Sequence, residues 1–425
     1  MGRRAVSTAS KYHGTVGSLK SVWMVLREQG PTALFARVLR NLARSVKPMP
    51  GSVPIRLLVK TEDASEVDWS IPHPAVIDPI RVGSGKLTIA WIMSPPGESS
   101  GGHQNIFRFI SYLEAAGHTV KIYLYSSLHP FTVSLVKAML DSSPSYPKLK
   151  ATIEAHTGQG VGSDVDAIFA TGWETAYASF RDESMARRFY FVQDFEPYFT
   201  PVGSASVLAE NTYRFGFHGI TAGGFLSHKL STEYGMTASH YDFGANQDLY
   251  KVTNSGRRKE IFFYARPVTE RRGFELGILA LAHFAAARPD YVINLAGWDV
   301  KEYAIPFPYV NLKDLRIDEL NGIYNRCAAG LVISLTNMSL LPLELLSSGV
   351  IPVVNDGLNN RLVSDNEFIE YADPSPKSLA RRLIEVVDRV DLPKHANAAS
   401  ASVKAADWDT AGDTFVRLFE DAVRG

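Results

Sequence analysis

The sequence lacks several features that mark membrane, secreted or metal-binding proteins. Only one of the 425 residues is a cysteine, Cys327, which excludes intrachain disulfides and cysteine-based metal sites and is typical of a reducing cytoplasm. No uncharged apolar run approaches the roughly 18–20 residues that span a bilayer, and no signal-peptide pattern follows the first basic residues. The 44 basic residues equal the 44 acidic ones, which argues against nucleic acid as a partner. We therefore expect a cytoplasmic protein of two or three domains.

The balanced charge hides a basic amino-terminal segment. Residues 1–50 hold nine Lys and Arg but a single acid, Glu28. Apolar residues recur there at helical spacing, with a break at Gly30-Pro31, and predict two short amphipathic helices. One interpretation is a peripheral contact with an anionic membrane surface, with Trp23 and Phe35 on the buried side. The other is a pair of helices packed on the protein body, and the sequence does not decide between them.

The remaining chain is organised as two α/β domains. Residues 48–85 are rich in proline, contain one strand-like run at 55–59, and are expected to form a surface connector. From Leu87 onward, and again from Ile261, short apolar strands alternate with amphipathic helices, which predicts two doubly wound parallel sheets. We expect an amino-terminal domain at 51–250 and a carboxyl-terminal domain at 251–408, with the helix 409–425 completing the first.

Such sheets bind ligands outside the carboxyl ends of their strands. After the predicted strand Leu87–Met93 comes a glycine-containing turn with Gly101 and Gly102, followed by a helix. Glycines at such a turn let backbone N–H groups approach a ligand, and a helix N-terminus favours an anion. An ordinary flexible connection is the alternative. Neither the Walker loop nor the dinucleotide fingerprint is matched.

A group of arginines follows the first strand of the second sheet. Arg266 and Arg272 flank a strand-to-helix turn about six residues apart, and such a pair is suited to clamping a diphosphate. The alternative is a set of surface arginines at a helix start. That reading is weakened because cations are unfavourable at a helix N-terminus unless an anion is bound there.

A third turn, at residues 334–341, precedes a helix that contains Glu344. Its carboxylate either stabilises the helix N-terminus or accepts hydrogen bonds from a ribose hydroxyl. Backbone amides near Ser339 and Leu340 are expected to add to an anion-binding cradle.

With these residues the chain resembles the glycosyltransferases of the two-domain GT-B fold, specifically family four. The stretch from Thr336 to Gly349 resembles the family's Glu-x7-Glu motif, with Glu344 as its second Glu. The resemblance implies a nucleotide-sugar donor, with Glu344 on the ribose, Arg266 and Arg272 on the diphosphate, and Gly101 and Gly102 in the amino-terminal glycine loop. It also implies a retaining mechanism.

A narrower resemblance lies in the run Gln193-Asp194-Phe195-Glu196-Pro197, which is similar to the WsaF-type rhamnosyltransferase branch. That branch uses dTDP-β-L-rhamnose. The resemblance implies that Gln193, Asp194 and Glu196 lie at the cleft, where they position the donor sugar or the acceptor; a loop salt-bridged to Arg214 is the alternative. Thr336 replaces the first Glu of the motif, and Gln193 replaces a His that contacts the donor sugar in many members.

We expect a glycosyltransferase that transfers L-rhamnose to a hydroxyl of a cell-surface glycan, with a lipid-linked glycan as one form of the acceptor. No cofactor or metal is expected, because Asp164-Val-Asp166 directly precedes a strand and the histidines show no zinc spacing. The same fold using a UDP- or GDP-sugar, and a nucleotide-sugar-binding or glycan-binding protein without turnover, remain alternatives. The sequence gives neither the acceptor nor the oligomeric state.

Overall fold

The protein is described by a computed structural model that covers residues 56–71, 85–98 and 100–424. Apart from Arg56, these residues belong to one compact unit, Leu57–Gly425. The basic segment 1–50 lies outside the described residues, so its two helices stay a prediction. Of the strand-like run at 55–59, residues 56–59 are described and form no strand. The prediction is wrong for these residues, and the carbonyl of Leu58 accepts instead from the hydroxyl of Ser127 (2.6 Å).

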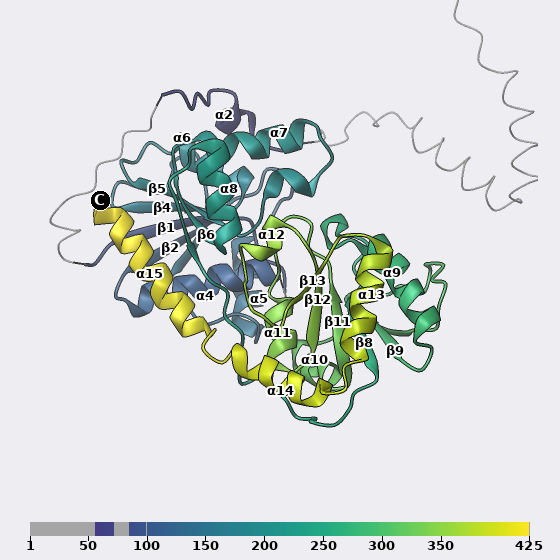
Figure 1. Cartoon of the computed structure of the whole chain (residues 1–425). Coiled ribbons are helices and arrows are strands. Elements are labelled where there is room, and N and C mark those ends of the chain that lie inside the picture. Colours follow the sequence, from purple (N-terminus) through teal and green to yellow (C-terminus); the bar gives the residue numbers. More distant parts are fainter. Residues whose placement is uncertain (1–55, 72–84, 99, 425) are drawn as a thin grey trace, which may run out of the picture. The chain divides into compact units, whose positions relative to one another are not determined.

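The first sheet is built entirely from parallel strands (Figure 1). Their order in space is β3-β2-β1-β4-β5-β6-β7. Their bounds are β1 Thr88–Met93, β2 Thr119–Leu124, β3 Thr152–Ala155, β4 Ala167–Ala170, β5 Arg187–Val192, β6 His218–Ala222 and β7 Ala238–Tyr241.

The second sheet is also parallel, with the order β10-β9-β8-β11-β12-β13. Its strands are β8 Glu260–Tyr264, β9 Val292–Ala296, β10 Val310–Lys313, β11 Cys327–Val332, β12 Ile351–Asn355 and β13 Glu370–Ala372. The sequence placed the strand β11 at 331–334, but it begins earlier. The small apolar residues from Cys327 to Gly330 are buried between neighbouring strands, and Gly330 leaves room for Leu345, which an added Cβ would approach to 2.6 Å.

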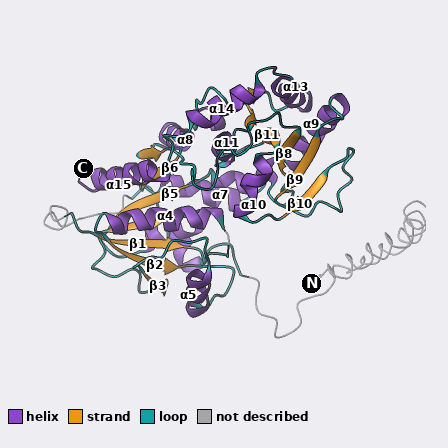
Figure 2. Ribbon diagram, turned by 90° about the horizontal axis from the view of Figure 1, so that it is seen from below, coloured by secondary structure: helices purple, strands orange, loops and turns teal. Residues whose placement is uncertain are grey.

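Helices connect most successive strands and cover the sheets (Figure 2), whereas within residues 100–424 β3 and β4, β7 and β8, and β9 and β10 follow each other without a helix. Those of the first half are α2 Thr61–Ala64, α4 Gly101–Ala115, α5 Val133–Ser142, α6 Trp173–Arg181, η1 Glu196–Phe199, α7 Ser204–Asn211, η2 Thr212–Arg214 and α8 Gly224–Tyr234. Those of the second half are η3 Glu270–Arg272, α9 Phe274–Ala287, α10 Ile317–Tyr324, α11 Leu341–Ser347, α12 Leu358–Arg361, α13 Pro376–Val387, α14 Leu392–Ser402 and α15 Trp408–Arg424.

Strand β1 is buried on both faces, as expected for a central parallel strand. Its alternate residues enter different cores: Trp91 packs with α4 and α15, whereas Ile92 belongs to a separate cluster that includes Ala178 of α6. Phe415 of α15 completes the first of these cores, with its ring centroid 6.2 Å from that of Trp91. The last helix of the chain is therefore part of the first sheet's hydrophobic core.

The strand order fixes where a ligand site belongs. In the first sheet the order reverses between β1 and β4, and in the second between β8 and β11. Crevices at such switch points, outside the carboxyl ends of the strands, are where doubly wound sheets bind ligands. The segments that follow β1, β5, β8 and β11, including the first turns of the helices α4 and α11, carry the residues that the sequence singled out for the site.

Candidate functional site

Gly101 and Gly102 lie after β1, and they form the first turn of α4 rather than the loop before it. The first helical hydrogen bond is donated by Gln104 to the carbonyl of Ser100 (2.9 Å), so the N–H groups of residues 101–103 have no partner within the helix. His103 holds the turn together: Nε2 lies 2.9 Å from the carbonyl oxygen of Ser94, and Nδ1 lies 2.8 Å from the hydroxyl of Ser100. The turn thus presents backbone donors, which suits an anion.

The arginines after β8 differ in their surroundings. Arg266 is exposed and donates to the hydroxyl of Tyr264 (2.9 Å). Arg272 is partly buried and donates to the hydroxyl of Ser334, which follows β11 (2.9 Å). Burial lowers the pKa of Arg272, and the neighbouring Asp194 carboxylate opposes that effect. A partly buried guanidinium beside a strand-to-helix turn is a ready binding group for phosphate oxygens.

The Asp194 carboxylate, at the end of β5, faces the second sheet. It accepts a hydrogen bond from Nε of Arg271 (3.1 Å) and one from the backbone N–H of Phe195 (2.9 Å). The guanidinium of Arg271 also lies 4.1 Å from the ring centroid of Phe199. Burial raises the pKa of Asp194, against the lowering effect of the Thr336 hydroxyl and of the two arginines. Asp194 therefore joins the two sheets within the arginine cluster.

Asn337 makes a second contact between the sheets. Its side-chain amide donates to the backbone carbonyls of Gln193 (3.2 Å) and Ala222 (3.0 Å). Asn337 follows β11, whereas its two acceptors follow β5 and end β6. The carboxyl ends of the central strands of both sheets are thus held against each other at the site.

The Glu196 carboxylate points away from Asp194's partners, toward the N-terminus of α6. It accepts hydrogen bonds from the backbone N–H of Trp173 (2.6 Å) and from the hydroxyl of Tyr190 (3.4 Å). Burial raises its pKa to about 8, and the nearby charges of Glu174 and Asp194 add to the rise. Glu196 is therefore largely protonated at neutral pH. The two carboxyl groups are two residues apart in the segment after β5 but have different hydrogen-bond partners.

Ser339 and Leu340 immediately precede α11. The carbonyl of Leu340 accepts from the N–H groups of Leu343 (3.1 Å) and Glu344 (3.2 Å), so the helix proper begins after it. Glu344 lies in the first turn, and the hydroxyl of Tyr324 donates to its carboxylate (3.4 Å). Burial raises the pKa of Glu344 to about 7, while that hydrogen bond and the positive charge of Arg108 act in the opposite direction.

The structure adds residues that sequence reasoning missed. Gln193 is hydrogen-bonded to Asn105 (3.3 Å) and to the carbonyl of Gly102 (3.1 Å), and Asn105 is bonded to Arg108 (2.5 Å). Arg271 was within reach of the sequence, since it adjoins Arg272. Asn105 and Arg108 were harder to find, although they lie three residues apart on one face of a helix that follows the glycine turn.

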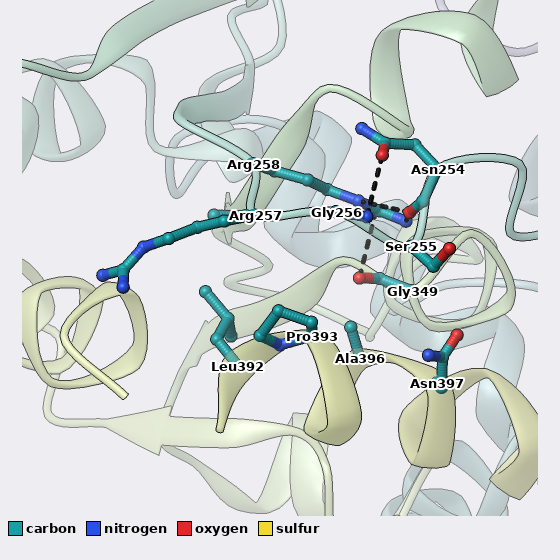
Figure 3. Close-up of a pocket in the computed structure, with 11 residues that line it drawn as sticks. Asn254, Ser255, Gly256, Arg257, Arg258, Gly349, Leu392, Pro393, Ala396 and Asn397 are labelled. Carbon is teal, nitrogen blue, oxygen red and sulfur yellow. Dashed lines mark hydrogen bonds between the residues drawn. The ribbon is translucent and has the colours of Figure 1, made fainter. Parts of the chain in front are cut away.

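A pocket away from these turns has a structural explanation (Figure 3). It lies between residues 254–258 and the start of α14. Arg258, which is buried, donates there to the backbone carbonyls of Ser348 (2.8 Å) and Gly349 (3.1 Å) at the end of α11. A guanidinium that satisfies the last carbonyls of a helix stabilises the helix end. We assign no ligand to this pocket.

The described residues hold neither a metal-binding cluster of side chains nor a membrane-spanning helix. Within residues 56–71, 85–98 and 100–424, His, Cys, Asp and Glu form no group of three or more that could hold a metal ion. Asp164 pairs with Lys121 (2.6 Å), and Asp166 accepts from the backbone N–H of Thr88 (2.7 Å), so both carboxylates serve the first sheet. No helix in this part of the chain is long and apolar enough to cross a bilayer.

Two comparisons relate the sequence to known proteins. Residues 259–384 match the family model described as the C-terminal domain of WsaF. The chain is 29% identical over 357 residues to the O-antigen biosynthesis protein RfbC of Myxococcus xanthus. That alignment covers 81% of this chain but only 28% of the relative, so the chain spans less than a third of the relative's length.

Solved structures share the fold at low identity. Anabaena HepE, solved with UDP and glucose, has a TM-score of 0.60 at 14% identity and is covered completely by 79% of this chain. TarM, from S. aureus, has a TM-score of 0.64 at 7% identity, with 80% of this chain and 99% of TarM covered. A putative UDP-N-acetylglucosamine 2-epimerase from Listeria monocytogenes has a TM-score of 0.52 at 11% identity, with 80% and 97% covered. The predicted α/β architecture of two Rossmann-like sheets, the GT-B fold, is confirmed.

Proposed function

We propose that this chain is a retaining glycosyltransferase, which transfers a sugar from a nucleoside-diphosphate sugar to a hydroxyl of a cell-surface polysaccharide. The observation that carries the proposal is the position of Arg272. It is a partly buried guanidinium at the switch point of the second sheet, beside the turn that leads to Glu344. The match to the WsaF domain spans both residues, which supports the same assignment.

The donor is proposed to lie along the carboxyl ends of β8 and β11. Arg266 and Arg272 bind the diphosphate, and the backbone amides of Ser339 and Leu340 add donors to it. Glu344 accepts a hydrogen bond from a hydroxyl of the nucleoside sugar. The first turn of α4, with Gly101 and Gly102, supplies N–H groups from the first sheet.

In the proposed reaction the bond between the anomeric carbon and the phosphate oxygen breaks, and the acceptor oxygen bonds to that carbon on the same face. The acceptor's proton passes to a phosphate oxygen, so no side-chain nucleophile is required. The guanidinium groups stabilise the negative charge that develops on the departing diphosphate, which is usually the largest contribution to catalysis.

Gln193, Asp194 and Glu196 are proposed to position the donor sugar and the acceptor. Glu196, whose buried carboxyl group has its pKa raised to about 8 and accepts from Trp173 and Tyr190, is proposed to do so by holding the segment after β5 in place. Asp194, which is already paired with Arg271, orients that arginine at the diphosphate.

The specific donor proposed is dTDP-β-L-rhamnose, and the acceptor is a glycan of the O-antigen or S-layer class, lipid-linked in one form. The donor is proposed from the resemblance of residues 193–197 to the WsaF-type branch, to whose C-terminal domain residues 259–384 also match, and the name of the Myxococcus relative supports the pathway. UDP is the competing nucleotide, because HepE was solved with UDP and glucose. We also propose a cytoplasmic location, supported by the single cysteine, with the basic segment 1–50 as a peripheral membrane contact.

Calorimetric titration with dTDP-L-rhamnose, UDP-glucose and GDP-mannose tests the proposal. We expect the dTDP-sugar to bind, and Arg272→Ala to weaken binding by about 1.5–3 kcal/mol, as for the loss of charge-assisted hydrogen bonds. Arg417→Ala is the matched control, because Arg417 is 65% exposed on the distant helix α15.

Three results would change the proposal. Binding of UDP-glucose alone would mean that the donor is a UDP-sugar and not dTDP-β-L-rhamnose. Binding of no nucleotide sugar, or an unchanged affinity in Arg272→Ala, would refute the site. Donor binding without release of dTDP in the presence of glycan acceptors would favour a binding protein. We also propose that donor binding needs no metal ion. Repeating the titration in the presence of EDTA tests this, and the affinity for the donor should not change.

A further inference from the structure

A chain of directed hydrogen bonds links α4 to the end of β5. Nη1 of Arg108 donates to Oδ1 of Asn105 (2.5 Å), and Nδ2 of Asn105 donates to Oε1 of Gln193 (3.3 Å). Nε2 of Gln193 then donates to the carbonyl of Gly102 (3.1 Å). An arginine carries only donors, so its contact decides which way the Asn105 amide faces, and Asn105 in turn decides the orientation of Gln193.

The guanidinium of Arg108 is also held by a contact outside the hydrogen-bond chain. It lies 3.8 Å from the ring centroid of Trp408, the first residue of α15. Just before Trp408, the segment that returns to the first sheet lies against the segment that leaves it. The N–H of Ala245 donates to the carbonyl of Ala406 (2.8 Å), and a Cβ on Gly244 would meet the backbone of residues 407 and 408. Arg108 is thus held at the place where the chain crosses between the two sheets.

The Gln193 amide keeps part of its hydrogen-bonding capacity. A glutamine amide has two donor hydrogens and two acceptor lone pairs. Among the described residues, its side chain makes one hydrogen bond through Nε2 and one through Oε1. One donor and one acceptor therefore remain, side by side and in a fixed order, beside the first turn of α4. That pair matches two adjacent hydroxyl groups of a sugar.

We propose that Arg108 is a positioning residue for the donor sugar, because it fixes the orientation of the Gln193 amide through Asn105. The inference rests on the proposed function, in which Gln193 contacts that sugar. Arg108 does not touch the donor in this assignment. Its contribution is to hold the amide in one of two flipped states before the sugar arrives, which lowers the cost of ordering on binding.

The test compares the affinity for a nucleoside diphosphate with the affinity for the corresponding nucleotide sugar. Calorimetry measures the Kd of dTDP and of dTDP-L-rhamnose for the wild type, Arg108→Met, Asn105→Asp and Gln193→Ala, with UDP and UDP-glucose as a second pair. Arg108→Met keeps an apolar stem on Trp408 but removes the donors. Asn105→Asp keeps the acceptor for Arg108 but removes the donor to Gln193, and it serves as the second variant if Arg108→Met does not fold.

We expect each substitution to raise the Kd of the nucleotide sugar about tenfold and to change that of the nucleotide diphosphate by less than about twofold. In the double variant Arg108→Met with Gln193→Ala, the Kd of the nucleotide sugar should equal that of Gln193→Ala alone, because both changes break one chain. Arg417→Met should leave both constants unchanged.

Two outcomes would overturn the inference while leaving the proposed function intact. An equal loss of affinity for both ligands would mean that Arg108 acts on the nucleotide, by contact with phosphate, through its charge near Glu344 or through the fold, and not on the sugar. Additive effects in the double variant would mean that Arg108 does not act through Gln193. A wild-type protein that binds neither ligand of either pair would instead refute the proposed function, and this inference with it.

Discussion

At the residue scale, burial changes the protonation of the Glu196 carboxyl group. The folded state holds its proton up to a pH of about 8, whereas the ordinary value for a glutamate is 4.5. Between these two values the folded state binds more protons than the unfolded state, so stability falls as the pH rises through that window. Burial of the carboxyl group, which the sequence did not reveal, is the cause, and the hydrogen bonds from Trp173 and Tyr190 oppose the rise.

Glu196→Gln should flatten this pH dependence, because the amide has no charge to bury and still accepts from Trp173. Thermal unfolding at pH 6 and pH 9 measures the effect. Between these two pH values Tm should fall less in the variant than in the wild type, and each kcal/mol of difference in unfolding free energy corresponds to about 2–4 °C. Glu385→Gln, at an exposed ion pair with Arg381, is the control. An identical fall in Tm for wild type and Glu196→Gln would show that Glu196 is not buried as described.

At the scale of elements, α15 belongs to the first sheet although it follows the second in sequence. Phe415 is fully buried, and its ring lies 4.7 Å from that of Phe109 and 5.8 Å from that of Phe169 between centroids. Phe415→Ala should therefore cost about 3–5 kcal/mol of unfolding free energy, as for other buried aromatic truncations.

Urea unfolding of Phe415→Ala measures this cost, with Arg417→Ala on the exposed face of the same helix as the control. The control should change the unfolding free energy by no more than about 0.5 kcal/mol. A loss below about 1 kcal/mol for Phe415→Ala would mean that α15 does not pack on the first sheet in solution.

At the scale of the whole molecule, the site contains an ion pair between the two sheets. The Asp194 carboxylate is bonded to Arg271 and acts on the charge of Arg272, so it offsets part of the positive charge that the diphosphate would use. Asp194→Asn should tighten the binding of dTDP a few-fold, since the arginines lose a competing anion. Sugar transfer should slow, because Asp194 no longer orients Arg271.

Calorimetry with dTDP and an assay of dTDP release measure the two effects in the same protein. Asp356→Asn, which breaks an exposed pair with Arg361, is the matched control. Weaker binding of dTDP in Asp194→Asn would mean that this carboxylate supports the nucleotide site instead of competing for it.

The sequence by itself determined the two α/β series and the turns that bear the site. Central strands such as β1 and β11 are continuous apolar runs, and their glycine, arginine and glutamate turns lie next to them in the chain. The edge strands β3, β7, β10 and β13 were missed, because they are short and mostly not buried and so carry little apolar signal.

Only the tertiary structure decided which side chains face one another. Asp194 and Arg271 are 77 residues apart in the sequence, and Arg108 and Trp408 are separated by the whole second sheet. The sequence grouped Asp194 with Glu196, whereas the fold gives each a different set of partners. Local patterns report which residues form a strand or a turn, but the order of strands in a sheet, which brings distant turns together, depends on long-range packing.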